Sequence, residues 1–168
     1  VEYREQESLL FDNGRLKAGD FSTDQGFGLR CVASEAIGYA HAGDLSAGAL
    51  RRAADAVSAV RNGRSGALAA APRGTNERRY GDENPIPQPG FDRKVALLQE
   101  IDAYLRNKDE SVRQVTVSLA TQWQRVEILR ADGRLVSDIR PLVRLNVAVV
   151  AGVGDRQETG SAGAGGRT

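Results

Sequence analysis

Residues 9–18 read LLFDNGRLKA, and residues 128–137 read ILRADGRLVS. Each stretch places an Asx-Gly pair between short apolar runs, which is the strongest local signal for a β-hairpin. Asn13 and Gly14 both tolerate the positive φ that a type I′ turn requires, and Asp132-Gly133 offers similar chemistry. The fold is therefore expected to be built around two hairpins, one near each end of the chain.

The segments that flank these turns repeat in the same order. Each contains a strand, the Asx-Gly turn, a strand, a break, a third strand, a second turn and a fourth strand; the breaks are predicted at residues 24–26 and at Pro141. The sequence therefore predicts an α+β fold, with an antiparallel-rich sheet built from two pseudo-repeated four-strand units and helices packed on one face. The units span 1–62 and 91–160. The alternative is independent use of common turn chemistry. LNVAVVAG, apolar on both faces, is predicted to be the central strand.

Two helices are predicted from apolar residues that recur at three- and four-residue spacing. Asp44 or Ser46 would cap the first and Asp92 the second. The predicted apolar stripes are Leu50, Ala53, Val57 and Val60, then Val95, Leu98, Ile101 and Leu105. A connecting loop is expected over 63–90. One domain would therefore cover 1–160, followed by a glycine-rich linker over 161–168.

The composition excludes several classes of protein. Charged residues make up 27% of the chain and leave a net charge of +1, so no strong field favours nucleic acid or a membrane surface. No apolar run is long enough to span a bilayer. One cysteine fits a reducing compartment, which predicts a cytoplasmic protein. The chain has no methionine and begins within a predicted strand, so we expect it to be a fragment of a longer protein.

No residue pattern predicts catalysis or metal binding in this chain. His41 is the sole histidine and has no motif-like nucleophile near it in sequence. Cys31 lies among apolar residues and is expected to be a buried, inert thiol. The glycine run GFG precedes a predicted strand rather than a helix, so it lacks the helix N-terminus that binds phosphate. The residues themselves thus predict a domain without its own active site.

Three long stretches resemble the amino-terminal domain of the TldD/PmbA family. They are LLFDNGRLKAGDFSTDQGFGLRCVASEAIGYAHAGDLS, GTNERRYGDENPIPQPGFDRKVALLQEIDAYLR and RPLVRLNVAVVAGVGDRQETGSAGAGGR. The resemblance covers essentially the whole chain and is stronger to the TldD branch, because of the long middle loop and the glycine-rich end.

The resemblance implies a cytosolic zinc metallopeptidase that processes small modified peptides or unfolded chains with a TldE/PmbA partner. The family's older description is modulator of DNA gyrase. Its zinc site uses a His-Glu-x-x-x-His motif in a carboxy-terminal domain, and this sequence contains no such motif. No catalytic or metal-binding residue is therefore predicted here. We expect zinc in the parent enzyme and no cofactor in this fragment.

Three roles remain open for this domain. It could form a wall of the substrate channel and offer a strand edge to a peptide, with seven candidate residues for close approach of a backbone. These are Gly26, Phe27, Gly28, Arg30, Gly163, Gly165 and Gly166. The alternative is that they only form turns. The domain could instead serve assembly, docking its own carboxy-terminal catalytic domain and a TldE/PmbA-like subunit or a second copy. The third role is a non-catalytic protein-interaction module, such as a modulator of DNA gyrase. No membrane or direct nucleic-acid partner is expected.

Overall fold

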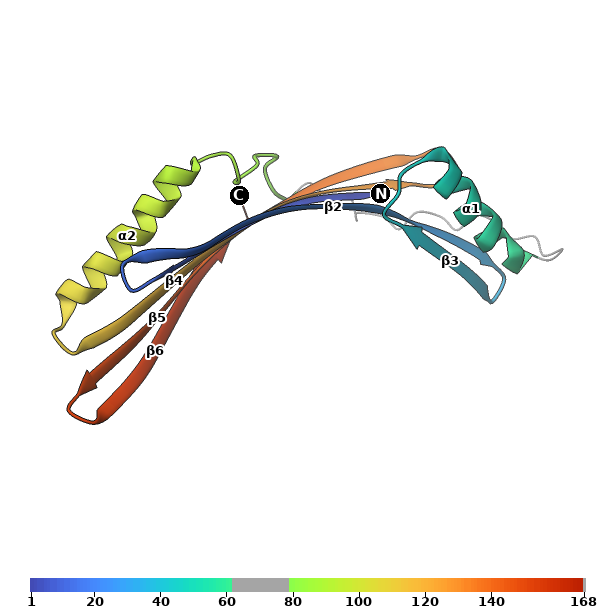
Figure 1. The fold of residues 1–168 in the computed structure, drawn as a ribbon. Coiled ribbons are helices and arrows are strands. Elements are labelled where there is room, and N and C mark those ends of the chain that lie inside the picture. Colours follow the sequence, from blue (N-terminus) through green and yellow to red (C-terminus); the bar gives the residue numbers. More distant parts are fainter. Residues whose placement is uncertain (62–78, 168) are drawn as a thin grey trace. The chain divides into compact units, whose positions relative to one another are not determined.

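The computed structural model describes residues 1–61 and 79–167. These residues form an α+β fold with a six-stranded antiparallel sheet and two α-helices (Figure 1). The strands are β1 (Glu2–Asp12), β2 (Arg15–Ala33), β3 (Ala36–Ala42), β4 (Val112–Leu129), β5 (Leu135–Val153) and β6 (Arg156–Gly166). The helices are α1 (Ala47–Ser58), which continues into the short 3₁₀ helix η1 (Ala59–Arg61), and α2 (Phe91–Lys108).

The strand order in the sheet is β3-β2-β1-β4-β5-β6. This order places β1 and β4 in the centre, so the prediction that LNVAVVAG forms the central strand is wrong. Those residues belong to β5, second from the edge. Their apolar character on one face arises because Leu145, Val147 and Val149 pack against the core under α2.

Within residues 1–61 and 79–167, each half of the chain contributes three strands rather than the four predicted. The predicted breaks lie inside the long strands β2 and β5. Gly26 continues β2 where the chain approaches β3 closely, since a Cβ there would meet the Ala42 carbonyl oxygen at 2.9 Å. Pro141 lies two residues before the β5–β6 ladder begins at Val143, so β5 borders no described strand on that side, and proline is tolerated at such edge positions. The duplication of the two halves stays a prediction.

The predicted turns are confirmed. Asn13 and Gly14 have φ angles of 48° and 74°, the pair of positive values that a type I′ turn needs. Gly133 has a φ of 82° in the β4–β5 turn, and the second predicted turn of the first half contains Ser34 with a φ of 55°.

The described residues divide into two compact units, and the long strands contribute to both. Unit 1 comprises Val1–Arg4, Asp24–Arg79 and Arg125–Asp138; unit 2 comprises Glu5–Thr23, Tyr80–Gln124 and Ile139–Thr168. The assignment of one domain to 1–160 stays a prediction.

In unit 2, α2 lies along one face of the strands (Figure 1). The core combines odd-numbered residues of β1 and β4 with α2: Leu9, Phe11, Val115, Val117, Leu119 and Leu98. The predicted stripe of α2 is confirmed, because Val95, Ile101 and Leu105 pack against this core. The cap differs: Gly90 occupies the N-cap position, and Asp92 lies in the first turn.

In unit 1, α1 packs on β2 and β3. Ser46 caps the helix, accepting a hydrogen bond from the Ala49 backbone N–H at 3.2 Å. Phe27, Ala49 and Ala53 form the buried cluster. Leu50, which the predicted stripe placed inward, is instead partly exposed, and Ala49 occupies the buried position. The predicted helix stop at Gly63 lies outside the described residues.

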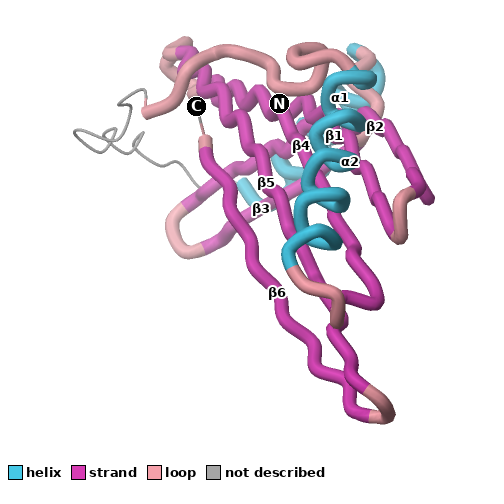
Figure 2. Tube along the Cα trace, turned by 90° about the vertical axis from the view of Figure 1, so that its left-hand side faces the viewer, coloured by secondary structure: helices cyan, strands magenta, loops and turns pink. Residues whose placement is uncertain are grey.

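The glycine-rich end is a strand rather than the predicted linker over residues 161–166. β6 pairs with β5 from Val153↔Arg156 to Val143↔Gly166, and Figure 2 shows it running beside β5 at the outer edge of the sheet. The backbone hydrogen-bonding capacity of β5, rather than side-chain burial, holds this segment, because all of its residues are exposed.

Of the predicted connecting loop 63–90, residues 79–90 are described, and several contacts within unit 2 hold them. Lys94 Nζ donates to the Ile86 carbonyl oxygen at 2.6 Å, and Asn84 Nδ2 donates to a Glu5 carboxylate oxygen at 2.7 Å. The indole N–H of Trp123 donates to the Asp82 carbonyl oxygen at 3.2 Å. This part of the loop is therefore attached to both β1 and β4.

Candidate functional site

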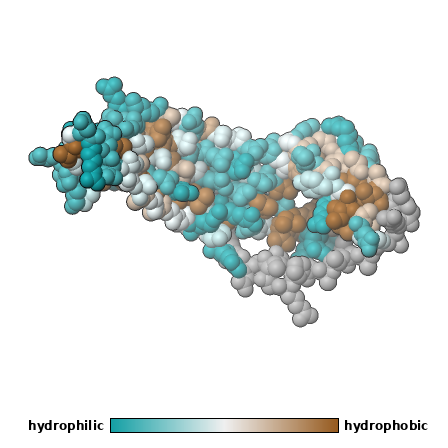
Figure 3. All heavy atoms as spheres, turned by 90° about the horizontal axis from the view of Figure 1, so that it is seen from below, coloured by the Kyte–Doolittle hydropathy of each residue, from teal (hydrophilic) through white to brown (hydrophobic). Residues whose placement is uncertain are grey.

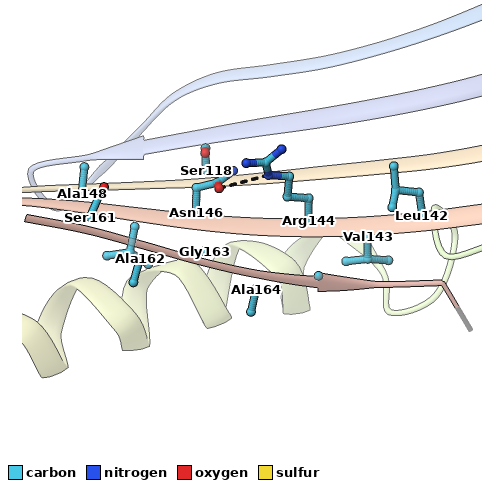
Figure 4. A pocket seen from close by; sticks show the side chains of 12 residues that line it. Ser118, Leu142, Val143, Arg144, Asn146, Ala148, Ser161, Ala162, Gly163 and Ala164 are labelled. Carbon is cyan, nitrogen blue, oxygen red and sulfur yellow. Dashed lines mark hydrogen bonds between the residues drawn. The ribbon is translucent and has the colours of Figure 1, made fainter.

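The face of unit 2 opposite α2 carries a groove over β5 and β6. The register pairs Arg144 with Gly165 and Asn146 with Gly163, so these four residues share one face. Their neighbours along β5 point to the other side, where they pack under α2. Figure 4 shows this separation: Ser118, Arg144 and Asn146 project away from the helix.

Two neighbouring hollows, which share two lining residues, make up this surface, which we call the helix-free groove. The larger hollow, about 660 Å³, is bounded mainly by β5 and β6. The smaller, about 340 Å³, extends across β1, β2 and β4. Leu142 and Arg144 line both. The remaining side chains that the groove presents are small or polar: Gln6, Ser8, Asp20, Ser22, Ser118, Ala120, Gln122, Asn146, Ala148 and Ser161.

Arg144 is the cation at the junction of the two hollows. Its Nε–H donates to the Asn146 side-chain oxygen at 3.1 Å (Figure 4). Arg144 is exposed, and within the described residues no carboxylate lies at ion-pair distance from it. The guanidinium group has five N–H donors, so the groove presents an oriented cation with donors left for a ligand.

Asp12 lies further along the helix-free side of β1, and its carboxylate already has hydrogen-bond partners within the protein. Its carboxylate accepts hydrogen bonds from Gln114 Nε2 at 2.9 Å and Thr116 Oγ1 at 2.8 Å. These bonds hold the pKa of Asp12 below its ordinary value of 3.8. Asp12 therefore stays ionised and serves to tie β1 to β4.

The predicted residues Gly163 and Gly165 line the larger hollow, and Gly166 ends the strand beside it. A Cβ at Gly163 would meet the Asn146 side-chain oxygen at 2.7 Å, and one at Gly165 would meet the Val143 carbonyl oxygen at 2.5 Å. Glycine is therefore required at both positions because groups of β5 occupy the space that a Cβ would need. Gly166 has open space where its Cβ would be.

The predicted residues Gly26, Phe27 and Gly28 line a different hollow, of about 790 Å³, within unit 1. Phe27 is buried against α1, so its side chain fills the core. The Tyr39 side chain lies across Gly28, where a Cβ would meet the tyrosine hydroxyl at 2.6 Å. Arg30 is exposed opposite Tyr39 and does not line this hollow. The structure therefore assigns the seven candidates to two separate units, and their role in binding stays a prediction.

The outer edge of β6 has the features of an edge open to pairing. The strand borders β5 on one side, and the described residues place no strand on its other side. Natural edge strands are often blocked by proline, lysine or inward-pointing charge. Residues 159–166, TGSAGAGG, contain none of these. A second extended chain could hydrogen-bond to this edge without a side-chain clash.

Sequence reasoning missed Arg144 and Asn146. Their signal was present in the alternation of Arg144-Leu145-Asn146-Val147, in which a polar set alternates with an apolar set. Treating LNVAVVAG as apolar on both faces hid it. Cys31, expected to be buried, is half-buried in β2.

The donor set does not fit a zinc site. The chain has one histidine and one cysteine, and no group of three or more His, Cys, Asp or Glu side chains within residues 1–61 and 79–167 is arranged to hold a metal ion. The same part of the chain contains no helix with the length and hydropathy that a membrane span requires.

Family models match both parts of the chain. Residues 1–70 match the PmbA/TldA metallopeptidase domain 1, and residues 84–168 match the PmbA/TldA metallopeptidase central domain. A metalloprotease TldD homolog of Haemophilus influenzae is 35% identical over 167 residues, covering 97% of this chain and 34% of that protein. A metalloprotease TldD homolog of Buchnera aphidicola subsp. Schizaphis graminum is 32% identical over 164 residues, covering 96% of this chain and 34% of that protein. The chain thus spans about a third of the length of these relatives.

Solved structures share the fold. A Thermotoga maritima protein described as a modulator of a DNA gyrase superposes with a TM-score of 0.80 at 15% identity, over 99% of this chain and 39% of that one. TldE from Thermococcus kodakarensis superposes with a TM-score of 0.61 at 12% identity, over 99% and 40%. At these identities the likeness establishes the fold.

Proposed function

The chain belongs to the PmbA/TldD metallopeptidase family, and we propose that it is the non-catalytic, substrate-binding part of a metallopeptidase. In this proposal an extended peptide pairs with the edge of β6, and its end or its side chains on that face extend over the helix-free groove of unit 2. The parent protein is a cytoplasmic zinc enzyme, and its zinc is held by residues outside this chain. Its substrates are small modified peptides or unfolded chains.

The single observation that carries this proposal is the unblocked edge of β6. Backbone N–H and C=O groups along an edge strand pair with an extended chain whatever its side chains are. A protein that must accept many sequences benefits from this mode, because the main chain supplies the affinity. The small residues of β6 leave space for the side chains of the peptide on both faces of the sheet.

Selective N-methylation of the peptide tests strand addition. In an antiparallel or parallel pair, alternate N–H groups of the added strand point to the edge and the others point away. Two isomers of one six-residue peptide would be methylated at alternate nitrogens, and their binding to the full protein measured by fluorescence anisotropy. The proposal predicts that one isomer loses binding while the other retains it. Equal binding of both isomers and the unmodified peptide would reject strand addition.

A second function, assembly with a TldE/PmbA-like subunit, is favoured by an apolar surface on unit 1. Val32 and Ile37 lie opposite each other on the side of β2–β3 away from α1, next to Tyr39, and all three are more than half exposed. Figure 3 shows that apolar (brown) surface is exposed among the hydrophilic (teal) surface on the face in view. Burial of such side chains would favour association.

Native mass measurement distinguishes this second function from peptide binding. The variant Ile37→Ser, placed in the full protein, is expected to weaken pairing with the TldE/PmbA-like subunit and to leave peptide affinity unchanged. Unchanged pairing would reject assembly through this surface. A non-catalytic interaction with DNA gyrase, the third role considered, has no observation within the described residues that favours it.

A further inference from the structure

Arg144 is placed where its guanidinium can contact a ligand in the groove and not only water. Most side chains of the groove floor are serine, glutamine and alanine, which would accept a neutral peptide backbone, and Asp20 of β2 adds a carboxylate to the smaller hollow. The arginine instead stands where the two hollows meet, and its hydrogen-bond partner is a neutral amide rather than an acid. Within the described residues Arg144 forms no ion pair with Asp20 or with any other carboxylate, so its guanidinium can attract an anionic ligand.

The orientation of Arg144 is built by two neighbouring residues. Asn146 accepts from its Nε–H, which leaves the two terminal nitrogens of the guanidinium for a ligand. The same Asn146 oxygen lies where a Cβ of residue 163 would be, at 2.7 Å. Glycine at 163, which pairs opposite Asn146 in the β5–β6 ladder, therefore leaves the room in which this amide is held.

We propose that Arg144, positioned by Asn146 and Gly163, binds a carboxylate of the peptide that lies in the helix-free groove. The terminal nitrogens of an arginine match the two oxygens of a carboxylate in a bidentate arrangement. The carboxylate comes from the peptide's C-terminal end or from an acidic side chain. This inference rests on the proposed peptide-binding function and adds a chemical preference that backbone pairing alone would not give.

Three peptides of one neutral six-residue sequence separate the possibilities. The first ends in a free carboxylate, the second in an amide, and the third in an amide with one internal residue replaced by aspartate. Affinities would be measured by fluorescence anisotropy with the full protein, and a chelator would keep the peptides intact. At least one carboxylate-bearing peptide is expected to bind about tenfold more tightly than the neutral amide, since a hydrogen bond between two charged groups is stronger than one between neutral groups. Whichever peptide gains identifies the source of the carboxylate.

Variants assign the preference to Arg144. Arg144→Gln is expected to abolish it, so that the carboxylate-bearing peptides bind no more tightly than the neutral amide. Gly163→Ala and Asn146→Ala are expected to reduce it, because they disturb the orientation of the guanidinium. Arg156→Gln is the matched control: Arg156 is a solvent-exposed arginine on β6 outside the groove, paired with Glu158. It should keep the full preference. Unfolding midpoints would confirm that each variant is folded.

Failure of the inference differs from failure of the proposed function. Equal affinity of the wild-type protein for all three peptides would overturn the role of Arg144, and so would a preference that survives Arg144→Gln. Strand addition would still stand in both cases, as judged by the two N-methylated isomers. Absence of binding by every peptide would overturn both.

Discussion

Lys94 of α2 and Glu7 of β1 form an ion pair inside unit 2, where the lysine side chain is 2% exposed and the glutamate 13%. Lys94 also donates to the Ile86 carbonyl oxygen, and Thr121 Oγ1 lies 3.4 Å from the same Glu7 oxygen. The lysine thus joins α2, β1 and the segment that precedes the helix.

Lys94→Met should destabilise the protein by about 3–5 kcal/mol, because it leaves the Glu7 carboxylate buried without a counter-charge. Chemical denaturation would measure the loss. The double variant Lys94→Met with Glu7→Leu should recover most of it, since a buried ion pair can be replaced by apolar residues at little cost.

Arg93→Met is the control for this prediction. Arg93 neighbours Lys94 but pairs with Glu100 at the surface, with both side chains at least 60% exposed. Its loss should cost less than about 1 kcal/mol. Equal effects of the two single variants would contradict a special role for the buried pair.

Gly38→Ala should destabilise unit 1 by about 1–3 kcal/mol, the usual range for overpacking. A Cβ at this position would meet the Val57 carbonyl oxygen at 2.8 Å and push α1 away from β3. Gly160→Ala on β6 is the control, because its Cβ would enter open space. Denaturation midpoints of the two variants should differ; a neutral Gly38→Ala would show that α1 moves aside freely.

Ser46→Ala should cost about 1 kcal/mol, the usual loss for an N-cap residue. Ser46 accepts from the Ala49 N–H and itself donates to Asp44, which also accepts from the Ser46 backbone N–H. Hydrogen exchange of the first-turn amides of α1 would detect the change. Ser58→Ala, at the other end of the helix, should leave this exchange unaltered; faster exchange in both variants would argue against a capping role.

Acid should remove a stabilising contribution from Asp12. Hydrogen bonds from Gln114 and Thr116 lower its folded-state pKa below 3.8, while the unfolded chain titrates near that value. The contribution is therefore fully present above the unfolded pKa and is lost as the pH falls through the folded pKa. Asp12→Asn should show a shallower loss of stability below about pH 4. An Asp12 carboxyl that titrates at or above 3.8 by NMR would contradict the assignment.

Local signals in the sequence predicted the turns and helices because they act within a few residues. Asn13-Gly14 specifies its turn through backbone conformation alone, and the stripe around Leu98 reflects helical periodicity. The lengths of β2 and β5 could not be predicted in this way, because they depend on pairing with residues that are distant in the sequence. Pro141 is compatible with β5 because it lies outside the β5–β6 ladder, whose last described pair joins Val143 to Gly166, and no local pattern reveals this.

The groove was only partly predictable for the same reason. Gly163 and Gly165 were predicted to let a peptide backbone approach closely, and this stays a prediction; the groups that lie close to them in the structure belong to β5. Arg144 and Asn146 acquire meaning only when the ladder places them beside those glycines. Lys94 was missed because a buried lysine on an apolar stripe is recognised only with Glu7 opposite it.

Photocrosslinking to β6 would show whether an extended peptide lies along this strand. A photoreactive residue would be placed at Ser161 on β6 or, as control, at Glu100 on the exposed side of α2, in the full protein with a labelled six-residue peptide. Peptide crosslinks are expected from position 161, where unlabelled peptide should compete with them, and none are expected from position 100. A peptide that binds the protein but crosslinks equally from both positions, or from neither, would contradict this placement of the peptide along β6.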